Sequence, residues 1–342
     1  MITVAGEALI DLVDEGGGWY RAHPGGSPAN VAVGLARLGV PCSLLARVST
    51  DAFGGQLASH LAGNGVSLRD VVRAAEPTTL ALASLDGAGQ AAYSFYVQGT
   101  ADWQWRRDEL PDALAPDVSA LHAGSLALAL PPGARAVEDL LAAERARGRV
   151  TISVDPNIRP PLAASRAGEV ARVERQIRLA HIVKASEEDT GWLYPGLDAE
   201  AVARRWQRLG PDLVVITLGA RGAYALGPDG TEARRPARPV RVADTVAAGD
   251  SFCAGLLDAL GRRGLLGTAG SPPAAPDAPG AAGGPGAAGP GRAPGAAGGM
   301  ALGRITARDV AEVLDWAILV AALTCARPGA DPPTREEALQ AR

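Results

Sequence analysis

Residues 151–155, TISVD, form a short run of apolar and β-branched residues that predicts a buried strand. Two later runs have the same character, HIVKAS at 181–186 and LVVITLG at 213–219. Residues 133–148 and 199–209 lie among these runs and carry helix formers with apolar residues three and four apart. Strands that alternate with helices in this way predict an α/β fold with a mostly parallel sheet covered on both faces.

Two segments interrupt the alternation and predict a second, smaller sheet. Residues 78–98 indicate two strands around the turn DGAGQ (86–90), a hairpin pattern. Residues 8–22 predict one or two further strands around EGGG. We expect these strands to lie outside the main layers and to form a lid.

Residues 267–299 differ sharply in composition from the rest of the chain. Of these 33 residues, 29 are Ala, Gly or Pro. Such a segment gains little apolar burial for the conformational entropy that it would lose on ordering. We expect a disordered surface insertion without chemistry of its own, whose removal leaves activity intact.

Composition excludes several classes of protein. The 342 residues suffice for one large domain, and the net charge of -4 with no basic block argues against nucleic acid as a partner. The three cysteines are far apart and suggest neither disulfides nor a zinc site. Without a signal-peptide pattern or an apolar run of about 20 residues, we expect a cytoplasmic protein that makes no membrane contact.

The stretch DTVAAGDSFCAG (244–255) places one carboxylate, Asp250, between small residues and an apolar helical pattern. Ala247, Ala248 and Gly249 then occupy the turn that enters a helix, where N–H groups lack intrahelical partners and attract anions. A carboxylate there repels phosphate, but it is useful as the base that deprotonates an attacking hydroxyl. Asp is also a favoured N-cap residue, so this stretch alone leaves both roles open.

A second stretch, PGGSPANVAVGLARLG (24–39), places two glycines before a helix. Gly25 and Gly26 would let a small polar ligand approach the backbone, and Asn30 offers a donor and an acceptor to its hydroxyl groups. A Gly-Gly turn before a helix is by itself weak evidence of a site.

Together these two stretches resemble the N-terminal and C-terminal signatures of the ribokinase (PfkB) family of carbohydrate kinases. Other motifs of that family appear in the same order along the chain: GEALIDL (6–12), STDAFG (49–54), DPNIRP (155–160), KASEED (184–189), TLGARGA (217–223) and CARPGADPPTREE (325–337). The resemblance covers the chain except for the Ala/Gly/Pro segment. It implies a ribokinase-like three-layer α/β sandwich with a β-sheet lid that closes over a sugar.

The resemblance also implies roles for individual residues. Asp250 matches the catalytic base, and Ala247, Ala248 and Gly249 match the anion hole for the transferred phosphoryl group. The positions that match or lie near sugar-binding residues are Asp11, Gly25, Gly26, Asn30, Asn157 and Arg159. Asp102, in TADWQW (100–105), is a further candidate for a hydroxyl contact, whereas the two tryptophans beside it are expected to pack beneath the lid.

The implied co-substrate is ATP with Mg²⁺. The residues that match or lie near nucleotide-binding positions are Lys184, Ser186, Thr217, Gly219 and Gly222. Asp189 and Glu188 are expected to organise Mg²⁺ through water, although a solvated acidic run at a helix start is the alternative. Asp244 and Thr245 match positions that hold a monovalent cation such as K⁺ in many relatives.

Two positions depart from the family pattern. The anion hole usually begins with Gly, and here Ala247 stands in its place, which we expect to be tolerated if its φ is negative. The usual Asn-x-x-Glu motif is replaced by Ser186 to Asp189, whose last carboxylate is one methylene shorter. We therefore expect Asp189 to act from the outer shell of the metal, with Glu188 as a substitute.

The sequence thus predicts an ATP-dependent sugar kinase that phosphorylates a primary hydroxyl. GEALIDL and DPNIRP resemble fructokinases most, which favours D-fructose and its 6-phosphate. A 2-keto-3-deoxygluconate kinase is the main alternative, followed by ribokinase and nucleoside kinase. A non-catalytic sugar or nucleotide sensor is a hypothesis of a different class, but it would not need Asp250. Similar proteins often form dimers through their lids, so a homodimer is considered too.

Overall fold

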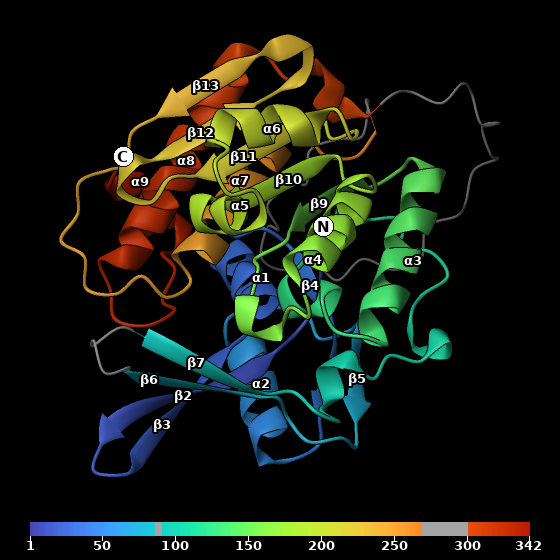
Figure 1. The fold of residues 1–342 in the computed structure, drawn as a ribbon, viewed down its shortest axis with the longest axis vertical. Helices are drawn as coiled ribbons and strands as arrows, with labels where there is room; N and C mark the ends of the chain where they lie inside the picture. The colour runs from blue at the N-terminus through green and yellow to red at the C-terminus, as the bar shows by residue number, and fades with distance from the viewer. Residues whose placement is uncertain (86–90, 269–299) are drawn as a thin grey trace, which may run out of the picture.

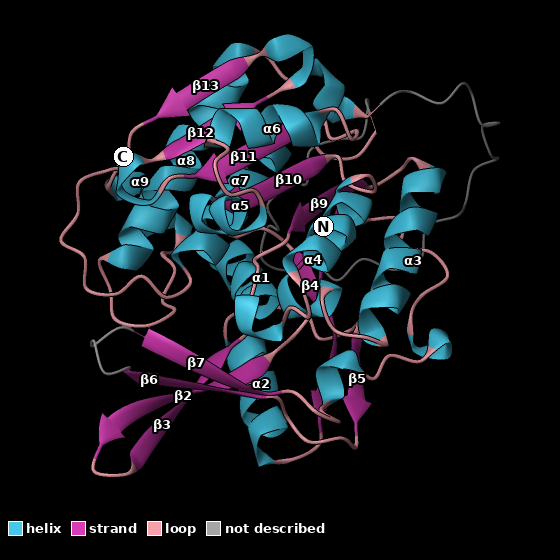
Figure 2. Cartoon of the chain, in the orientation of Figure 1, coloured by secondary structure: helices cyan, strands magenta, loops and turns pink. Residues whose placement is uncertain are grey.

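The computed structural model describes residues 1–85, 91–268 and 300–342. Within them the central sheet has nine strands in the order β13-β12-β11-β10-β9-β8-β1-β4-β5 (Figures 1 and 2). These strands are β1 (Ile2–Ala5), β4 (Cys42–Ser49), β5 (Val71–Ala74), β8 (Ala120–Gly124), β9 (Thr151–Asp155), β10 (Ile182–Ser186), β11 (Leu213–Thr217), β12 (Ala223–Leu226) and β13 (Glu232–Arg235). Neighbours from β5 to β11 pair in parallel, and β12 and β13 add antiparallel pairs at one edge.

Helices cover both faces of this sheet, which is why the middle strands lack exposed residues. One face packs on α1 (Ser27–Arg37), α2 (Ala52–Gly63), α7 (Ala248–Arg262), α8 (Ala307–Cys325) and α9 (Arg335–Gln340). The other packs on α3 (Gly133–Arg147), α4 (Arg166–Ile177), α5 (Glu187–Leu193) and α6 (Ala199–Gln207). All residues of β8 and β9 are buried, as expected for parallel strands between two helical layers. The predicted three-layer arrangement is confirmed.

The predicted small sheet is also present and projects from the main layers near α2 (Figure 1). It contains β2 (Leu9–Gly16), β3 (Trp19–Gly25), β6 (Leu80–Leu85) and β7 (Ala91–Tyr96) in the order β3-β2-β6-β7. The outer pairs are antiparallel and the central pair is parallel. The expected turn at 86–90 lies outside the described residues.

Trp103 packs beneath the small sheet, as the sequence predicted, whereas Trp105 packs instead in the core on one face of the main sheet. Trp103 lies in a 3-10 turn, Ala101–Trp103, and forms an apolar cluster with Leu9 of β2, Ala81 of β6 and Leu126. This cluster fixes the small sheet to the main layers on the side where the parallel strands end. Asp102 is thereby placed under the same sheet.

Two remaining expectations concern other parts of the chain. Of the segment 267–299, only Gly267 and Thr268 are described, and Thr268 forms an isolated antiparallel bridge with Met300. The rest of that segment lies outside the described residues. None of the helices in the described part of the chain is both long and apolar enough to span a membrane.

Candidate active site

Asp250 lies in the first turn of α7 and is only 8% exposed. Its carboxylate accepts two hydrogen bonds from α1, a helix near the other end of the chain. Ser27 Oγ donates to Oδ1 at 2.6 Å, and Asn30 Nδ2 donates to Oδ2 at 2.9 Å. Burial raises the pKa of Asp250, while these two hydrogen bonds and the charge of Lys184 limit that rise. Both carboxylate oxygens are therefore held in fixed positions.

The turn that begins α7 presents N–H groups beside Asp250. Ser251 N donates to Ala247 O at 2.8 Å, which closes the first turn. Ala248 N donates to Thr245 O at 3.2 Å and is therefore already used in the structure. Within the described residues, the N–H groups of Gly249 and Asp250 have no backbone partner. These two amides and the positive end of the helix dipole make the turn suitable for an anion, and the anion hole stays a prediction.

The methyl group of Ala247 was expected to be tolerated if the φ of this residue is negative, and in the structure its φ is positive. Ala247 is the N-cap of α7 with φ 57° and ψ 12°, in the left-handed region. A non-glycine residue there costs roughly 1–2 kcal/mol because Cβ crowds the following carbonyl oxygen. Ser125 and Asn157 also adopt positive φ, at 57° and 41°. These strained residues follow β8 and β9 and begin α7, a distribution that is typical of functional sites.

Lys184 of β10 lies next to this turn and carries the positive charge of the site. Its Nζ bonds Asp155 Oδ2 of β9 at 2.7 Å, and both side chains are buried. A Cβ added to Gly249 would lie 3.0 Å from that Nζ, so the ammonium group is adjacent to the turn. Burial is the largest single influence and lowers the pKa of Lys184, but the charge and hydrogen bond of Asp155 together with the other nearby groups outweigh burial, and the pKa is raised. The site therefore holds a permanent cation beside the free amides.

Both positions before α1 require glycine, because a side chain at either would collide with neighbouring atoms. A Cβ on Gly25 would lie 2.0 Å from Asp11 Oδ2, and a Cβ on Gly26 would lie 2.7 Å from Glu7 O. Gly26 also has φ 100°, which favours glycine. Burial, and then the charge of Asp250, raise the pKa of Asp11 to about 6. Asp11 and Asn30 thus both lie near Asp250, and the two glycines pack against Asp11 and Glu7.

Two fully buried carboxyl groups lie deeper, at the end of β1. Ala8 N donates to Asp102 Oδ1 at 3.0 Å, and Ala127 N donates to Glu7 Oε2 at 3.1 Å. Burial raises the pKa of each to about 7. Within the described residues, Asp102 Oδ2 has no hydrogen-bond partner. The sequence predicts Asp102 as a site residue but not Glu7, although Glu7 lies in the motif GEALIDL.

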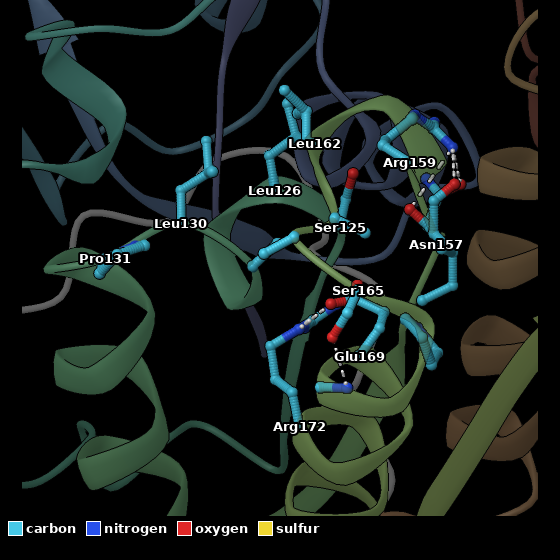
Figure 3. A pocket seen from close by; sticks show the side chains of 16 residues that line it. Ser125, Leu126, Leu130, Pro131, Asn157, Arg159, Leu162, Ser165, Glu169 and Arg172 are labelled. Atoms are coloured by element: carbon cyan, nitrogen blue, oxygen red, sulfur yellow. Dashed lines mark hydrogen bonds and ion pairs between the residues drawn. The ribbon is translucent and has the colours of Figure 1, made fainter. Parts of the chain in front are cut away.

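Asn157 and Arg159 line a cavity of about 240 Å³ (Figure 3). Arg159 Nη1 donates to Asn157 Oδ1 at 2.7 Å, and its charge acts on both Asp11 and Glu7. In Figure 3 leucine side chains form one side of the cavity, and the ion pair of Glu169 and Arg172 lies at its end. The guanidinium group of Arg159 therefore lies at this cavity and near enough to Asp11 and Glu7 to lower the pKa of each.

Ser186 and Asp189 form a capping box at the start of α5 rather than an open ligand pair. Asp189 Oδ2 accepts from Ser186 N and Oγ, and Oδ1 accepts from Ile158 N at 2.8 Å. Glu188 is exposed. The described residues contain no group of three or more His, Cys, Asp or Glu residues that could hold a metal ion. Both oxygens of Asp189 are in use, so the outer-shell role remains a prediction.

Thr217, Gly219 and Gly222 lie together in the turn after β11. Gly219 and Gly222 have φ of 57° and 94°. A Cβ on Gly222 would lie 1.9 Å from Arg235 O, so only glycine fits there. The turn is therefore tight, and it lies at the end of β11, where Arg221 forms an ion pair with Glu187 of α5.

Asp244 connects the segment before α7 with the segment after α8. Its Oδ2 accepts from Gly329 N at 2.8 Å, and Ala243 N donates to Cys325 O at 2.8 Å. Thr245 is exposed. This arrangement brings carbonyl and carboxylate oxygens near the anion-binding turn, where a monovalent cation was expected.

Comparison with known proteins identifies the family. The model of the "pfkB family carbohydrate kinase" matches residues 1–270. The chain belongs to this family. The kinase is 38% identical over 264 residues to a fructokinase of Rhizobium leguminosarum bv. trifolii, which covers 76% of this chain and 79% of that protein.

Solved structures agree with this result. Fructokinase from Xylella fastidiosa with bound ATP matches the kinase with a TM-score of 0.83, 27% identity, and coverage of 99% and 97% of the two chains. Fructokinase from Vibrio cholerae O395, with fructose, ADP and calcium bound, matches with a TM-score of 0.76, 26% identity, and coverage of 96% and 94%. A double mutant of the Vibrio protein was solved with fructose, ADP and potassium. The protein is therefore an enzyme, a carbohydrate kinase.

Proposed function

We propose that the kinase transfers the γ-phosphoryl group of ATP to the primary hydroxyl of D-fructose and forms fructose 6-phosphate, with Asp250 as the general base. The observation that carries this proposal is the position of the Asp250 carboxylate, buried beside the free amides of Gly249 and its own N–H. The named fructokinases among the relatives and structural neighbours support fructose as the acceptor.

The sugar occupies the space beside Asp250 that is lined by residues from both ends of the chain. Asp11, Asn30 and Arg159 offer acceptors and donors to its hydroxyl groups, and the small sheet covers it. Asp102, with one oxygen unpaired, is available to a further hydroxyl. A covering sheet excludes water, which would otherwise compete with the sugar for the phosphoryl group.

Asp250 accepts the proton of the attacking hydroxyl as the new O–P bond forms. Burial raises its pKa and so makes its ionised form a stronger base, while the nearby Lys184 charge keeps it ionised. The amides of Gly249 and Asp250 and the ammonium group of Lys184 neutralise the charge of the transferred group. Phosphoryl transfer depends mainly on such positioning and neutralisation.

ATP and Mg²⁺ are placed on the other side of Lys184. The turn at Thr217, Gly219 and Gly222 suits the nucleotide. Ser186 lies nearby, at the end of the neighbouring strand β10. Bound Mg²⁺ supplies charge neutralisation on the phosphates and usually keeps several waters, so Glu188 would reach it through water. The oxygens around Asp244 and Thr245 suit a monovalent cation, and the potassium-bound Vibrio relative supports this assignment.

A panel of acceptors tests the proposal. We expect ADP release with D-fructose to exceed, in kcat/KM, that with 2-keto-3-deoxygluconate, D-ribose, a nucleoside and D-glucose. The product should be identified as the 6-phosphate by its phosphorus NMR coupling to the C6 protons. A higher kcat/KM for another acceptor would reassign the substrate, and sugar-independent nucleotide binding without turnover would indicate a sensor.

A further inference from the structure

Ser27 is the first residue of α1, yet its hydroxyl group does not cap that helix. The N-cap position is Gly26, and it makes no side-chain capping bond. The hydroxyl group of Ser27 donates instead across the molecule to Asp250 Oδ1. Ser27 follows the N-cap position, and its hydroxyl group bonds a carboxylate on another helix and not the backbone of its own helix.

The hydroxyl group of Ser27 lies where the sugar hydroxyl that accepts the phosphoryl group would be expected to bond Asp250. The length of its hydrogen bond to Asp250, 2.6 Å, lies in the range of charge-assisted O–H···O⁻ bonds. A general base needs its substrate hydroxyl within about 2.6–3.2 Å. Asp250 is buried, whereas Ser27 and Asn30 are each only half-buried, and each pairs with one carboxylate oxygen. The side chains of Ser27 and Asn30 therefore cover the Asp250 carboxylate on its more exposed side.

We propose that, before sugar binds, the hydroxyl group of Ser27 holds the position on Asp250 Oδ1 that the sugar hydroxyl later takes, and so keeps water out of it. This inference rests on the proposed role of Asp250 as base. Ser27 is then a positioning residue that acts through Asp250. The sugar hydroxyl can replace it because the sugar makes further bonds to the site, whereas a single water cannot.

Without the Ser27 hydroxyl, a water molecule would take its place on Oδ1. With ATP bound, Asp250 would accept a proton from that water, whose oxygen would bond to the γ-phosphorus. The bond from this phosphorus to the β,γ-bridging oxygen would break, and ADP and inorganic phosphate would leave. Loss of the hydrogen bond from Ser27 to Asp250 therefore converts the kinase partly into an ATPase.

The charged environment of Asp250 predicts a second effect of the same change. Lys184 of β10 lowers its pKa, Asp155 of β9 raises it, and Asp11 of β2 repels it. Cys253 on α7 has a thiol pKa raised by burial and stays neutral. The hydrogen bond from Ser27 lowers the pKa of Asp250 in the sugar-free enzyme, so its removal should move the acid limb of kcat/KM to higher pH.

The test compares Ser27→Ala with Ser27→Thr, which keeps a hydroxyl group at the same carbon. ADP and phosphate release are measured with Mg·ATP and no sugar, followed by the ratio of ADP to fructose 6-phosphate at fructose concentrations below its KM. We expect Ser27→Ala to raise sugar-free ADP release about tenfold, which corresponds to the loss of one hydrogen bond. We expect it also to raise the ADP to product ratio above one, and Ser27→Thr to restore both values.

Several outcomes would overturn the inference. One is a wild-type rate of sugar-free ADP release in Ser27→Ala together with an unshifted acid limb of kcat/KM. Another is a phosphate on Ser27, detected by intact mass after incubation with ATP, because the hydroxyl would then be an acceptor. If Ser27→Ala fails to fold, Ser27→Cys keeps the volume with a weak donor and should also raise the sugar-free rate. Wild-type enzyme that releases no ADP with any sugar would instead refute the proposed function.

Discussion

Lys184 and Asp155 form a buried ion pair of 2.7 Å next to the turn that begins α7. The pair connects two adjacent parallel strands at their carboxyl ends, where the phosphoryl group is proposed to move. Removal of one partner leaves an uncompensated buried charge, whereas removal of both does not. This relationship gives the first prediction.

Lys184→Met should lower the free energy of unfolding by about 3 kcal/mol, because Asp155 remains buried without its partner. It should also move the acid limb of kcat to higher pH, since the ammonium group lowers the pKa of Asp250. Urea unfolding and a pH profile check both effects. In Lys184→Met/Asp155→Asn, stability and the acid limb should return toward wild type. A single variant as stable as wild type would contradict the ion-pair assignment.

Asp250→Asn should reduce kcat by about 10³-fold, because the amide cannot accept the hydroxyl proton. Asn keeps the size of the side chain, so fructose and ATP should still bind. Calorimetric titration of each ligand measures binding separately from turnover. Turnover close to wild type would mean that another group is the base.

Ala247→Gly should raise the free energy of unfolding by about 0.5–1 kcal/mol. Glycine adopts φ 57° without strain, and this gain exceeds its larger loss of backbone entropy. Chemical denaturation of the variant and of wild type measures the difference. A destabilised variant would indicate that the methyl group makes contacts that outweigh the strain.

Gly25→Ala should raise the KM for sugar and lower stability, since its Cβ would lie 2.0 Å from Asp11 Oδ2 and displace that carboxylate. Gly55→Ala is the matched control, because a Cβ there meets no atom within 4 Å on α2. The control should be at least as stable as wild type and have an unchanged KM. Equal effects of the two substitutions would show that Asp11 does not determine sugar affinity.

Asp102 should make stability depend on pH in a defined direction. Burial raises its pKa in the folded state to about 7, above its ordinary value of 3.8. The folded protein therefore binds the proton more tightly, and this stabilisation is complete below about pH 4 and disappears as pH rises through 7. Between pH 5 and pH 8, deprotonation of Asp102 should lower the free energy of unfolding of the wild type by about 2 kcal/mol. Asp102→Asn should lack this part of the decrease. Urea unfolding at both pH values would show no such difference between wild type and variant if Asp102 is ionised throughout.

Local patterns in the sequence were sufficient to predict the layers of the fold. Runs such as 151–155 and 213–219 are apolar and β-branched because both faces of these strands are covered. Their alternation with amphipathic helices leaves few alternatives to a parallel sheet. The two signature stretches also pointed to Asp250 and Asn30, because small residues before a helix are visible in a linear sequence.

The sequence alone determined which chemical groups this kinase possesses and on which strands and helices they lie. Only the tertiary structure decided which of them meet: the hydroxyl group of Ser27 with Asp250, Lys184 with Asp155, and Glu7 with the turn at Ala127. These pairs depend on how helices and strands far apart in the sequence pack together. A local sequence pattern does not contain that information. The positive φ of Ala247 follows from the same cause, because the packing of α7 against α1 and α8 fixes its backbone against its own preference.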